Sequence, residues 1–294
     1  LDVEVNKAID DGLWWVYTNR EAVYFPIPQD HLKAPDGSAG LKGEYFNNTS
    51  LSGDPVLVRV DPVVDFSWGG GSPAAEVNYD FFSVRWTGEI EISRPGTYTF
   101  ATYNDDGTRL YIDDQLVIDN WWGHGPSWYY SDPLSLTAGR HSVRLEFFEG
   151  AGGANVSLCW ISPELPYCRW NNERGGYHYY ANTTASAVQA FEINGHLETG
   201  DPDQDPYVDA VRGGLNYLLN SLVTYNMTAQ TFGHPEDYDN DGDAADDGGN
   251  GIGLAVNSSR AIYETGAVMD ALVATGTPDA IARIGGVNVL GRRY

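Results

Sequence analysis

The sequence predicts an α+β protein of more than one domain, in which an antiparallel β-sandwich or barrel is inserted between α-helical hairpin segments. The chain has 294 residues, and at about 150 residues per domain this length favours two domains. Residues 41–163 alternate short runs rich in Val, Ile, Thr, Tyr and Trp with Gly, Pro and Asp, a texture typical of short strands and turns. Helical periodicity occurs on both sides of that region.

The N-terminal segment is predicted to be helical. Residues 3–18 repeat apolar side chains at helical spacing, from Val5 to Val16. Prolines and the run of residues 34–38 (Ala-Pro-Asp-Gly-Ser) then indicate a linker. The predicted parts are an N-terminal helix that belongs to the helical region (1–25), a linker (26–39), the β-module (40–163) and a helical segment (164–294).

At least seven short runs within the β-module are predicted to be strands. Asp113 and Asp114 lie between two of these runs and indicate a hairpin turn, as do residues 94–96. So many short strands in so short a segment favour an antiparallel sandwich or barrel. The runs are 55–60, 83–92, 96–102, 109–112, 115–118, 142–148 and 155–160.

After residue 166 the pattern predicts three helices, which repeat in sequence. Residues 184–191 align with 265–272 at an offset of 81, and residues 210–218 align with 8–16 at an offset of 202. Calling these types A and B, the order is B, β-module, A, B, A, and a further B helix is expected near residue 291. Helix pairs of this kind need neighbours to bury their apolar faces. The predicted helices are 183–195, 206–223 and 260–275.

The composition narrows the function classes. The formal net charge is −24, from 41 acidic and 17 basic residues, and such a field repels phosphate backbones and anionic lipid. No apolar window reaches 18 residues, so we expect no membrane insertion. We expect neither nucleic-acid binding nor a membrane-surface role, whereas the excess of carboxylates suits divalent cations. The chain opens within a helical pattern and without an initiator Met, so we interpret it as a processed product or a segment of a longer precursor.

Two further features fit an exterior protein. Cys159 and Cys168 are predicted to form one disulfide, with two buried free thiols as the alternative. Glycosylation depends on the machinery of the source organism. Six Asn-x-Ser/Thr acceptor sequences occur, at Asn47, Asn48, Asn155, Asn182, Asn226 and Asn257.

An acidic loop over residues 236–248 is a candidate calcium site. Its Asp-x-Asp-x-Asp-Gly run begins at Asp237, and alternate side chains of such a run converge on one ion. Position twelve is Gly248 rather than Glu, so Asp247 or its neighbour Asp246 would have to supply the closing carboxylate. The alternative is a solvated acidic loop. The candidate ligands are Asp237, Asp239, Asp241, Asp243 and Asp247.

The middle segment resembles the fourteen-kilodalton module of anthrax protective antigen, which also occurs in yeast flocculins and adhesins and as an insert in some β-glucosidases. The resemblance implies two antiparallel sheets in an extracellular module that frequently binds carbohydrate and, in the adhesins, requires calcium. The matching stretches, in family order, are 40–46 (Gly-Leu-Lys-Gly-Glu-Tyr-Phe), 82–88 (Phe-Ser-Val-Arg-Trp-Thr-Gly), 96–100 (Gly-Thr-Tyr-Thr-Phe), 104–110 (Asn-Asp-Asp-Gly-Thr-Arg-Leu), 118–121 (Ile-Asp-Asn-Trp) and 144–147 (Arg-Leu-Glu-Phe).

The resemblance also implies a site. In the adhesins the pair that matches Asp105 and Asp106 is joined by a cis peptide, so that both carboxylates hold one Ca²⁺. Asp119 and Asn120 are expected to add ligands and to leave positions for sugar hydroxyls. The alternative is a tight turn under a lid of packed aromatic side chains. The sugar-contact candidates crowd the next loop and have flat rings that stack on sugars; they are Trp121, Trp122, His124, Trp128, Tyr129 and Tyr130.

The flanking helices resemble the α/α-toroid repeats of prenyltransferases and terpene cyclases, through residues 251–254 and 263–266 (Gly-Ile-Gly-Leu and Tyr-Glu-Thr-Gly). The acidic clusters that those enzymes use do not occur on a helix here, so we interpret the helices as a scaffold. The chain has no nucleophile elbow, no phosphate-binding loop and no zinc-type His spacing. Carboxylates such as Glu146, Glu149 and Glu264 would need a glycosidase spacing that sequence cannot give.

The first functional hypothesis is a non-catalytic, secreted or cell-surface protein that binds glycans through the calcium-dependent β-module. The second is a structural subunit whose orphan A helix takes the B helix of the next copy, in a head-to-tail homopolymer. A chain that is one piece of a longer toroid would explain the same helix order. A third hypothesis is the carbohydrate-binding part of a larger glycosidase.

Overall fold

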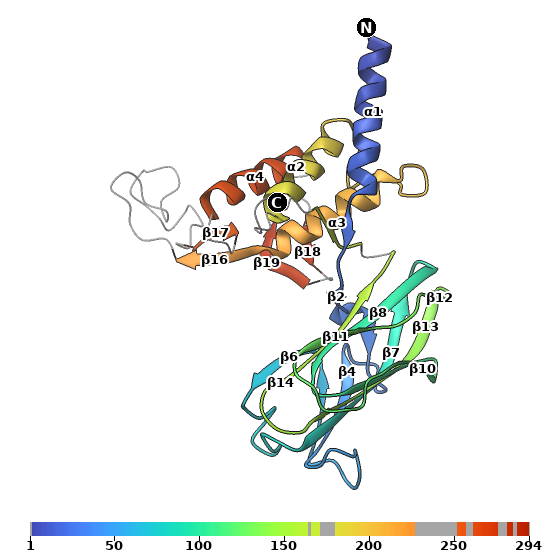
Figure 1. The fold of residues 1–294 in the computed structure, drawn as a ribbon, viewed down its shortest axis with the longest axis vertical. Coiled ribbons are helices and arrows are strands. Elements are labelled where there is room, and N and C mark those ends of the chain that lie inside the picture. The colour runs from blue at the N-terminus through green and yellow to red at the C-terminus, as the bar shows by residue number, and fades with distance from the viewer. Residues whose placement is uncertain are drawn as a thin grey trace. The chain divides into compact units, whose positions relative to one another are not determined.

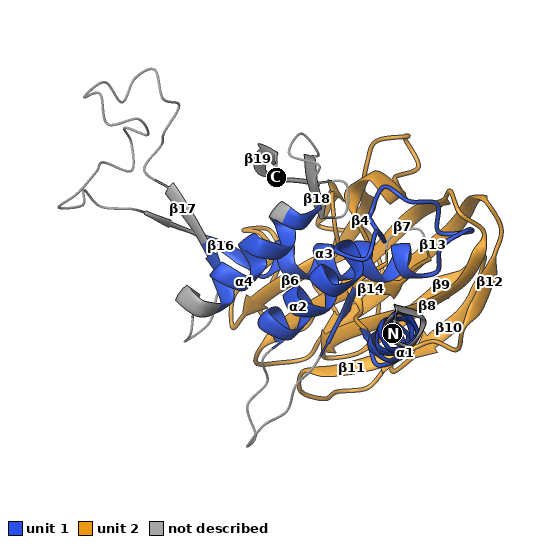
Figure 2. Cartoon of the chain, turned by 90° about the horizontal axis from the view of Figure 1, so that it is seen from above, with its two compact units in different colours: residues 1–21, 168–282, 291–294 blue, residues 22–167, 283–290 orange. Residues whose placement is uncertain are grey.

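The computed structural model describes residues 2–163, 166–170, 180–226, 252–256, 261–275, 281–284 and 287–293. The chain divides into two compact units, coloured separately in Figure 2. Unit 1 comprises Leu1–Glu21, Cys168–Ala282 and Gly291–Tyr294, and unit 2 comprises Ala22–Tyr167 and Arg283–Leu290.

Unit 2 contains two antiparallel sheets. The first has seven strands in the order β10-β9-β13-β7-β4-β5, with β3 also paired to β7. Its longest ladder joins β13 to β7 from Gly139 opposite Ile92 to Glu149 opposite Phe82. The strands are β3 (Leu32–Lys33), β4 (Leu41–Phe46), β5 (Leu57–Asp61), β7 (Phe82–Ile92), β9 (Thr108–Ile112), β10 (Gln115–Asp119) and β13 (Gly139–Glu149).

The second sheet has six strands in the order β11-β8-β14-β2, with β12 paired to β8 and β6 paired to β14. Figure 1 shows the two sheets of unit 2 as two layers, which agrees with the antiparallel sandwich that the sequence predicts. A short 3₁₀ helix, η1 (Gln29–His31), precedes β3. The strands are β2 (Phe25–Pro26), β6 (Asp65–Gly69), β8 (Gly96–Asp105), β11 (Ser127–Tyr130), β12 (Leu134–Leu136) and β14 (Ala154–Ile161).

The core between the sheets is rich in large aromatic side chains and surrounds one buried carboxylate. Trp86, Phe147 and Trp160 are buried there. Asp61, at the end of β5 and 3% exposed, accepts hydrogen bonds from Tyr45 Oη at 2.6 Å and Trp86 Nε1 at 2.7 Å. Arg59 Nε, 2.6 Å from Asp61 Oδ1, neutralises the charge. A buried carboxylate needs such partners because its desolvation is costly.

Gly43 in β4 leaves room for this network. A Cβ atom at position 43 would lie 2.6 Å from Asp61 Oδ2 and 3.0 Å from Trp86 Nε1. No other residue type fits there without moving Asp61 or Trp86.

Unit 1 contains the four predicted helices, α1 to α4. Three of them pack together: α2 contacts both α3 and α4, with Val188 and Phe191 buried on α2 and Val268 buried on α4. Among the described residues, no helix is long and apolar enough to cross a bilayer. The resemblance to a toroid stays a prediction. The helices are α1 (Asp2–Thr18), α2 (Tyr180–Glu192), α3 (Tyr207–Asn220) and α4 (Ala261–Ala274).

The predicted helix 206–223 is too long at its C-terminal end. The chain leaves α3 after Asn220 and forms β16 (Leu222–Asn226), which pairs antiparallel with β17 (Ile252–Val256). Val223, Thr224 and Tyr225 are strand formers, and pairing with β17 outweighs the helical spacing of Leu222 with the preceding leucines. The remaining strands are β1 (Glu21–Ala22), which pairs with β15 (Cys168–Arg169), and β18 (Ile281–Ile284), which pairs with β19 (Val287–Arg293).

The predicted disulfide is wrong, because Cys159 and Cys168 are both free and buried. Cys159 lies in β14 of unit 2, whereas Cys168 begins β15 in unit 1. The Cys168 thiol donates to the carbonyl oxygen of Ala210 in α3 at 3.6 Å. Burial raises the pKa of both thiols, that of Cys168 to about 12, so neither is a ready nucleophile for disulfide formation.

Replacing Asp61 with Ala is expected to destabilise unit 2 by about 3–5 kcal/mol, because it leaves Arg59 without its counter-ion and two buried donors without an acceptor. Denaturant unfolding measures the loss, and Asp54→Ala on an exposed loop is the matched control. Equal stability of the two variants would contradict this account of the core.

Candidate cation site

The candidate site lies where β8 ends and the chain turns toward β9. Asp105 is the last residue of β8, and its peptide bond to Asp106 is cis, as the resemblance implies. The Asp106 carboxylate is held by two backbone amides: that of His124 donates to Oδ1 and that of Gly150 donates to Oδ2, each at 2.7 Å. Asp106 is therefore fixed in one orientation by two loops that are distant in sequence.

Gly107 allows this turn to pack. A Cβ atom at position 107 would lie 2.5 Å from Cε1 of Phe148 and 2.8 Å from the carbonyl oxygen of Asn120. The Asp-Asp-Gly sequence thus places two carboxylates before a residue that must have no side chain.

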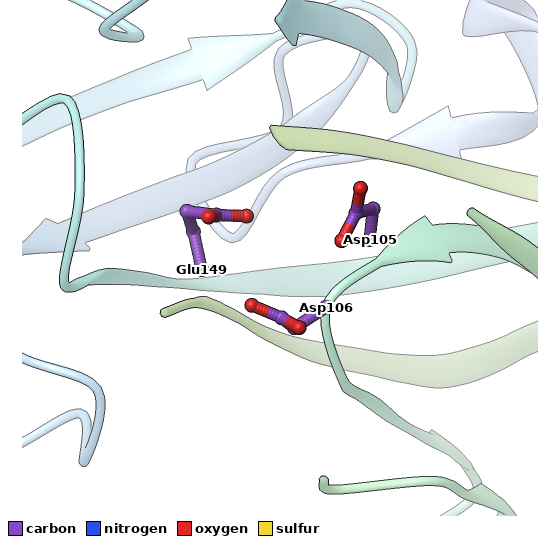
Figure 3. A group of neighbouring side chains, drawn as sticks. All are labelled: Asp105, Asp106 and Glu149. Carbon is purple, nitrogen blue, oxygen red and sulfur yellow. The ribbon is translucent and has the colours of Figure 1, made fainter. Parts of the chain in front are cut away.

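Glu149 is the third carboxylate of the site, and sequence reasoning did not place it there. It ends β13, and its ligand oxygen lies within 4.8 Å of those of Asp105 and Asp106. Figure 3 shows the three side chains close together, Asp105 at the end of β8, Asp106 directly after it and Glu149 at the end of β13. Glu149 is 0% exposed, and neither of its carboxylate oxygens has a hydrogen-bond partner among the described residues.

The electrostatics of this group favour a bound cation. Burial, followed by the charges of Asp106, Asp105 and Asp80, raises the pKa of Glu149 to about 8. Burial and the charge of Asp106 also raise the pKa of Asp105, against a lowering effect of His124. Like charges gathered away from water repel one another unless a proton or a metal ion lies between them.

The donor set fits Ca²⁺. All three side chains offer carboxylate oxygens, the hard ligands that Ca²⁺ prefers, and Ca²⁺ takes six to eight of them. Asn155 lies opposite Asp105 in the β14–β8 ladder, and its buried Oδ1 also lacks a hydrogen-bond partner among the described residues. A Ca²⁺ held by these residues would keep coordination positions for water or a ligand hydroxyl.

The other two predicted calcium ligands lie outside this group of three. Asp119 is exposed and pairs with Arg109, with 3.3 Å between Oδ1 and Nε. Asn120 is buried, and its Oδ1 accepts from the Thr108 hydroxyl at 2.7 Å. Its Nδ2 lies 3.1 Å from Nε2 of His124. Asn120 therefore supports the loop that positions His124 and, through it, Asp106.

The predicted sugar-contact residues separate into three groups. Trp122 and His124, on the loop that holds Asp106, contact each other and Tyr129 of β11, with ring centroids 5.0–6.1 Å apart. Trp121 packs on Phe148 instead, at 4.9 Å. The third group is Trp128 and Tyr130, which alternate with Tyr129 along β11 and are exposed.

Sequence reasoning also missed the segment that precedes β7. The Phe81 amide donates to the carbonyl oxygen of Gly150 at 2.9 Å, and the Phe81 side chain is 60% exposed. Asp80 accepts from the Gly152 amide at 3.1 Å. The exposed ring of Phe81 beside the loop that follows Glu149 is a signal for contact with a bound molecule. The sequence alone does not show this proximity, because it depends on the pairing of distant strands.

The remaining predicted sites are placed as follows. The acidic loop and Asn257 lie outside the described residues. Asn47 and Asn48 use their side-chain amides in loop hydrogen bonds, Asn182 is exposed on α2, and Asn226 ends β16. Glu146 forms ion pairs with Arg85, Arg109 and Arg144, and Glu264 lies in α4.

Comparison with known proteins identifies the β-module. Residues 37–174 match the family model described as PA14 domain, so this part of the chain is similar to a PA14 domain. The anti-sigma-I factor RsgI3 of Acetivibrio thermocellus is 40% identical over 125 residues, which are 42% of this chain and 19% of that protein. The protective antigen of Bacillus anthracis is 29% identical over 110 residues, which are 34% of this chain and 14% of that protein.

The chain therefore spans about a fifth or less of the length of these two curated relatives. Among solved structures, the PA14 sugar-binding domain from an RTX adhesin superposes with a TM-score of 0.36 and 20% identity. That match covers 48% of this chain and 93% of the other.

Calcium is expected to raise the Tm of the whole chain by several degrees, because an ion bound only by the folded state stabilises it. The variant Glu149→Gln should lose most of this shift. In chelator at pH 8.5, Glu149 of the parent chain is mostly charged because its pKa is about 8. Under these conditions Glu149→Gln should be more thermostable than the parent, because the variant removes the repulsion between Glu149 and the two aspartates.

A variant with Asp239→Asn and Asp241→Asn separates the effect of the acidic loop from that of this site. A calcium shift that survives Glu149→Gln but disappears in the loop variant would contradict the assignment.

Proposed function

We propose that the PA14-like domain is a non-catalytic glycan-binding module and that a Ca²⁺ held by Asp105, Asp106 and Glu149 is its anchor for sugar hydroxyls. The observation that carries the proposal is the buried Glu149 carboxylate. Both of its oxygens lack a hydrogen-bond partner among the described residues and lie beside two further carboxylates. Such a group is costly to keep unless it binds a cation.

In this proposal the ion supplies the polar contact and the aromatic rings supply the apolar one. Three carboxylates leave part of the Ca²⁺ shell open, and vicinal sugar hydroxyls are neutral oxygen donors of suitable spacing. Trp122 is 51% exposed and belongs to the loop in which His124 holds Asp106. Its ring would stack on the apolar face of a bound sugar, and Phe81 would contact it from the side of Gly150.

The charge of the chain supports a neutral ligand. With a net charge of −24, the protein disfavours polyanions at long range. The PA14 domain of the RTX adhesin is described as a sugar-binding domain. We extend that property to this chain, together with an extracellular or cell-surface location.

A glycosidase role for the three carboxylates has less support. Their ligand oxygens lie within 4.8 Å of one another, whereas inverting enzymes separate the two groups by about 6.5–9.5 Å and retaining enzymes by about 5–5.5 Å. Glu149 is also fully buried, so it would not reach a scissile bond.

Self-assembly is the second candidate function, favoured by helix α1. Ile9, Trp14 and Trp15 on this helix are exposed although Leu13 is buried, so part of its apolar surface is available to another copy. Light scattering with and without chelator tests this candidate. A monomer in both conditions would exclude it for this segment.

The sugar-binding proposal predicts calcium-dependent retention on a glycan array, lost in chelator and in Asp105→Asn. Trp122→Ala should weaken binding to the retained glycan by about tenfold, since one stacked ring contributes on the order of 1 kcal/mol or more. Calcium binding should persist in Trp122→Ala. Asp54→Asn, on an exposed loop, is the control for loss of one carboxylate, and glycan binding that is indifferent to chelator would refute the proposal.

A further inference from the structure

A second aromatic surface lies on the outer face of the sheet that contains β8, β11 and β14. We call it the outer aromatic platform and define it by Tyr24, Tyr103, Trp128 and Tyr130. Trp128 lies 5.1 Å from Tyr103 and 6.1 Å from Tyr24, and Tyr130 lies 5.0 Å from Tyr24, between ring centroids. The four rings are therefore continuous.

Strand alternation separates this platform from the aromatic rings of the loop that holds Asp106. Along β11, Tyr129 is turned to Trp122 and His124, whereas Trp128 and Tyr130 point to the opposite face. Trp128 is 42% and Tyr130 is 54% exposed. Their ring planes differ by only 6°, with centroids 6.3 Å apart, so two large rings with nearly parallel planes reach solvent on one side of one strand.

Polar groups continue the platform across the sheet. Trp128 is opposite Tyr103, Tyr103 is opposite Ser157, and Ser157 is opposite Asp65. Directly opposed residues point to the same face, so these four side chains form one row over β11, β8, β14 and β6. At about 4.8 Å per strand the row is about 14 Å long. The Ser157 hydroxyl donates to Asp65 at 2.5 Å, which holds a carboxylate and a hydroxyl beside the rings.

We propose that the outer aromatic platform binds a neutral β-1,4-linked polysaccharide lying across the strands, at a site separate from the cation site. Equatorial linkages make such a chain an extended ribbon with apolar C–H faces, which suit contact with exposed aromatic rings such as those of Trp128 and Tyr130. Its edge hydroxyls match Ser157 and Asp65. The net charge of −24 disfavours anionic polymers and acidic proteins as occupants. An elongated row suits a polymer rather than a terminal sugar.

The test is retention of the whole chain by insoluble polysaccharides, with cellulose, chitin and mannan as probes and cross-linked α-linked dextran as the negative control. We expect binding to at least one β-1,4-linked probe and none to dextran. The double variant Trp128→Ala and Tyr130→Ala should weaken that binding by about tenfold or more. Tyr79→Ala, which removes an exposed ring outside the platform, should leave it unchanged.

Chelator and Asp105→Asn distinguish this proposal from the cation-dependent one, because neither should reduce retention on the polysaccharide. Retention that is absent, that disappears in chelator, or that survives the double variant would overturn the platform. If the double variant instead changes the molecular mass or the unfolding of the chain without affecting retention, the platform is a protein contact and the proposal is wrong. Failure of the glycan array with intact polysaccharide retention would refute only the calcium proposal.

Discussion

Repulsion among three carboxylates at one end of a sandwich is the constraint on which the functional account depends. Asp105, Asp106 and Glu149 bring their ligand oxygens within 4.8 Å of one another, and Glu149 is removed from water. Burial and neighbouring charge raise the pKa of Glu149 to about 8. A protein that maintains such a cluster gains from a divalent cation, because the cation converts mutual repulsion into attraction.

The fold creates this cluster by bringing separate strand ends together. The β14–β8 ladder brings the loop after Glu149 to the end of β8, where the Gly150 amide holds Asp106. The loop after β10 supplies a second amide from His124, and Asn120 supports that loop from the buried side. The site is therefore positioned by backbone hydrogen bonds within the sheet, and the rings of Phe81 and Trp122 are exposed beside it.

Local sequence was sufficient for the features that depend on neighbours in the chain. The Asp-Asp-Gly turn, the alternating strand runs and the spacing of helices α1 to α4 are of this kind. Glu149 could not be placed beside Asp105, because their proximity depends on pairing between distant strands. The predicted disulfide is wrong for the same reason: Cys159 and Cys168 are close in sequence, but each thiol is buried within a different unit. Likewise, the crowded aromatic residues 121–130 form one run in sequence, yet alternation along β11 sends Tyr129 and Trp128 to opposite faces.

One domain thus has two proposed modes of sugar contact, a cation with open coordination positions and an exposed cluster of aromatic rings. Anomalous diffraction from crystals grown with Ca²⁺ tests most directly whether the three carboxylates hold the ion. We predict a peak bonded to oxygens of Asp105, Asp106 and Glu149, with the remaining coordination positions open to solvent or sugar. A well-ordered site that holds only water between these carboxylates at saturating Ca²⁺ would contradict the account.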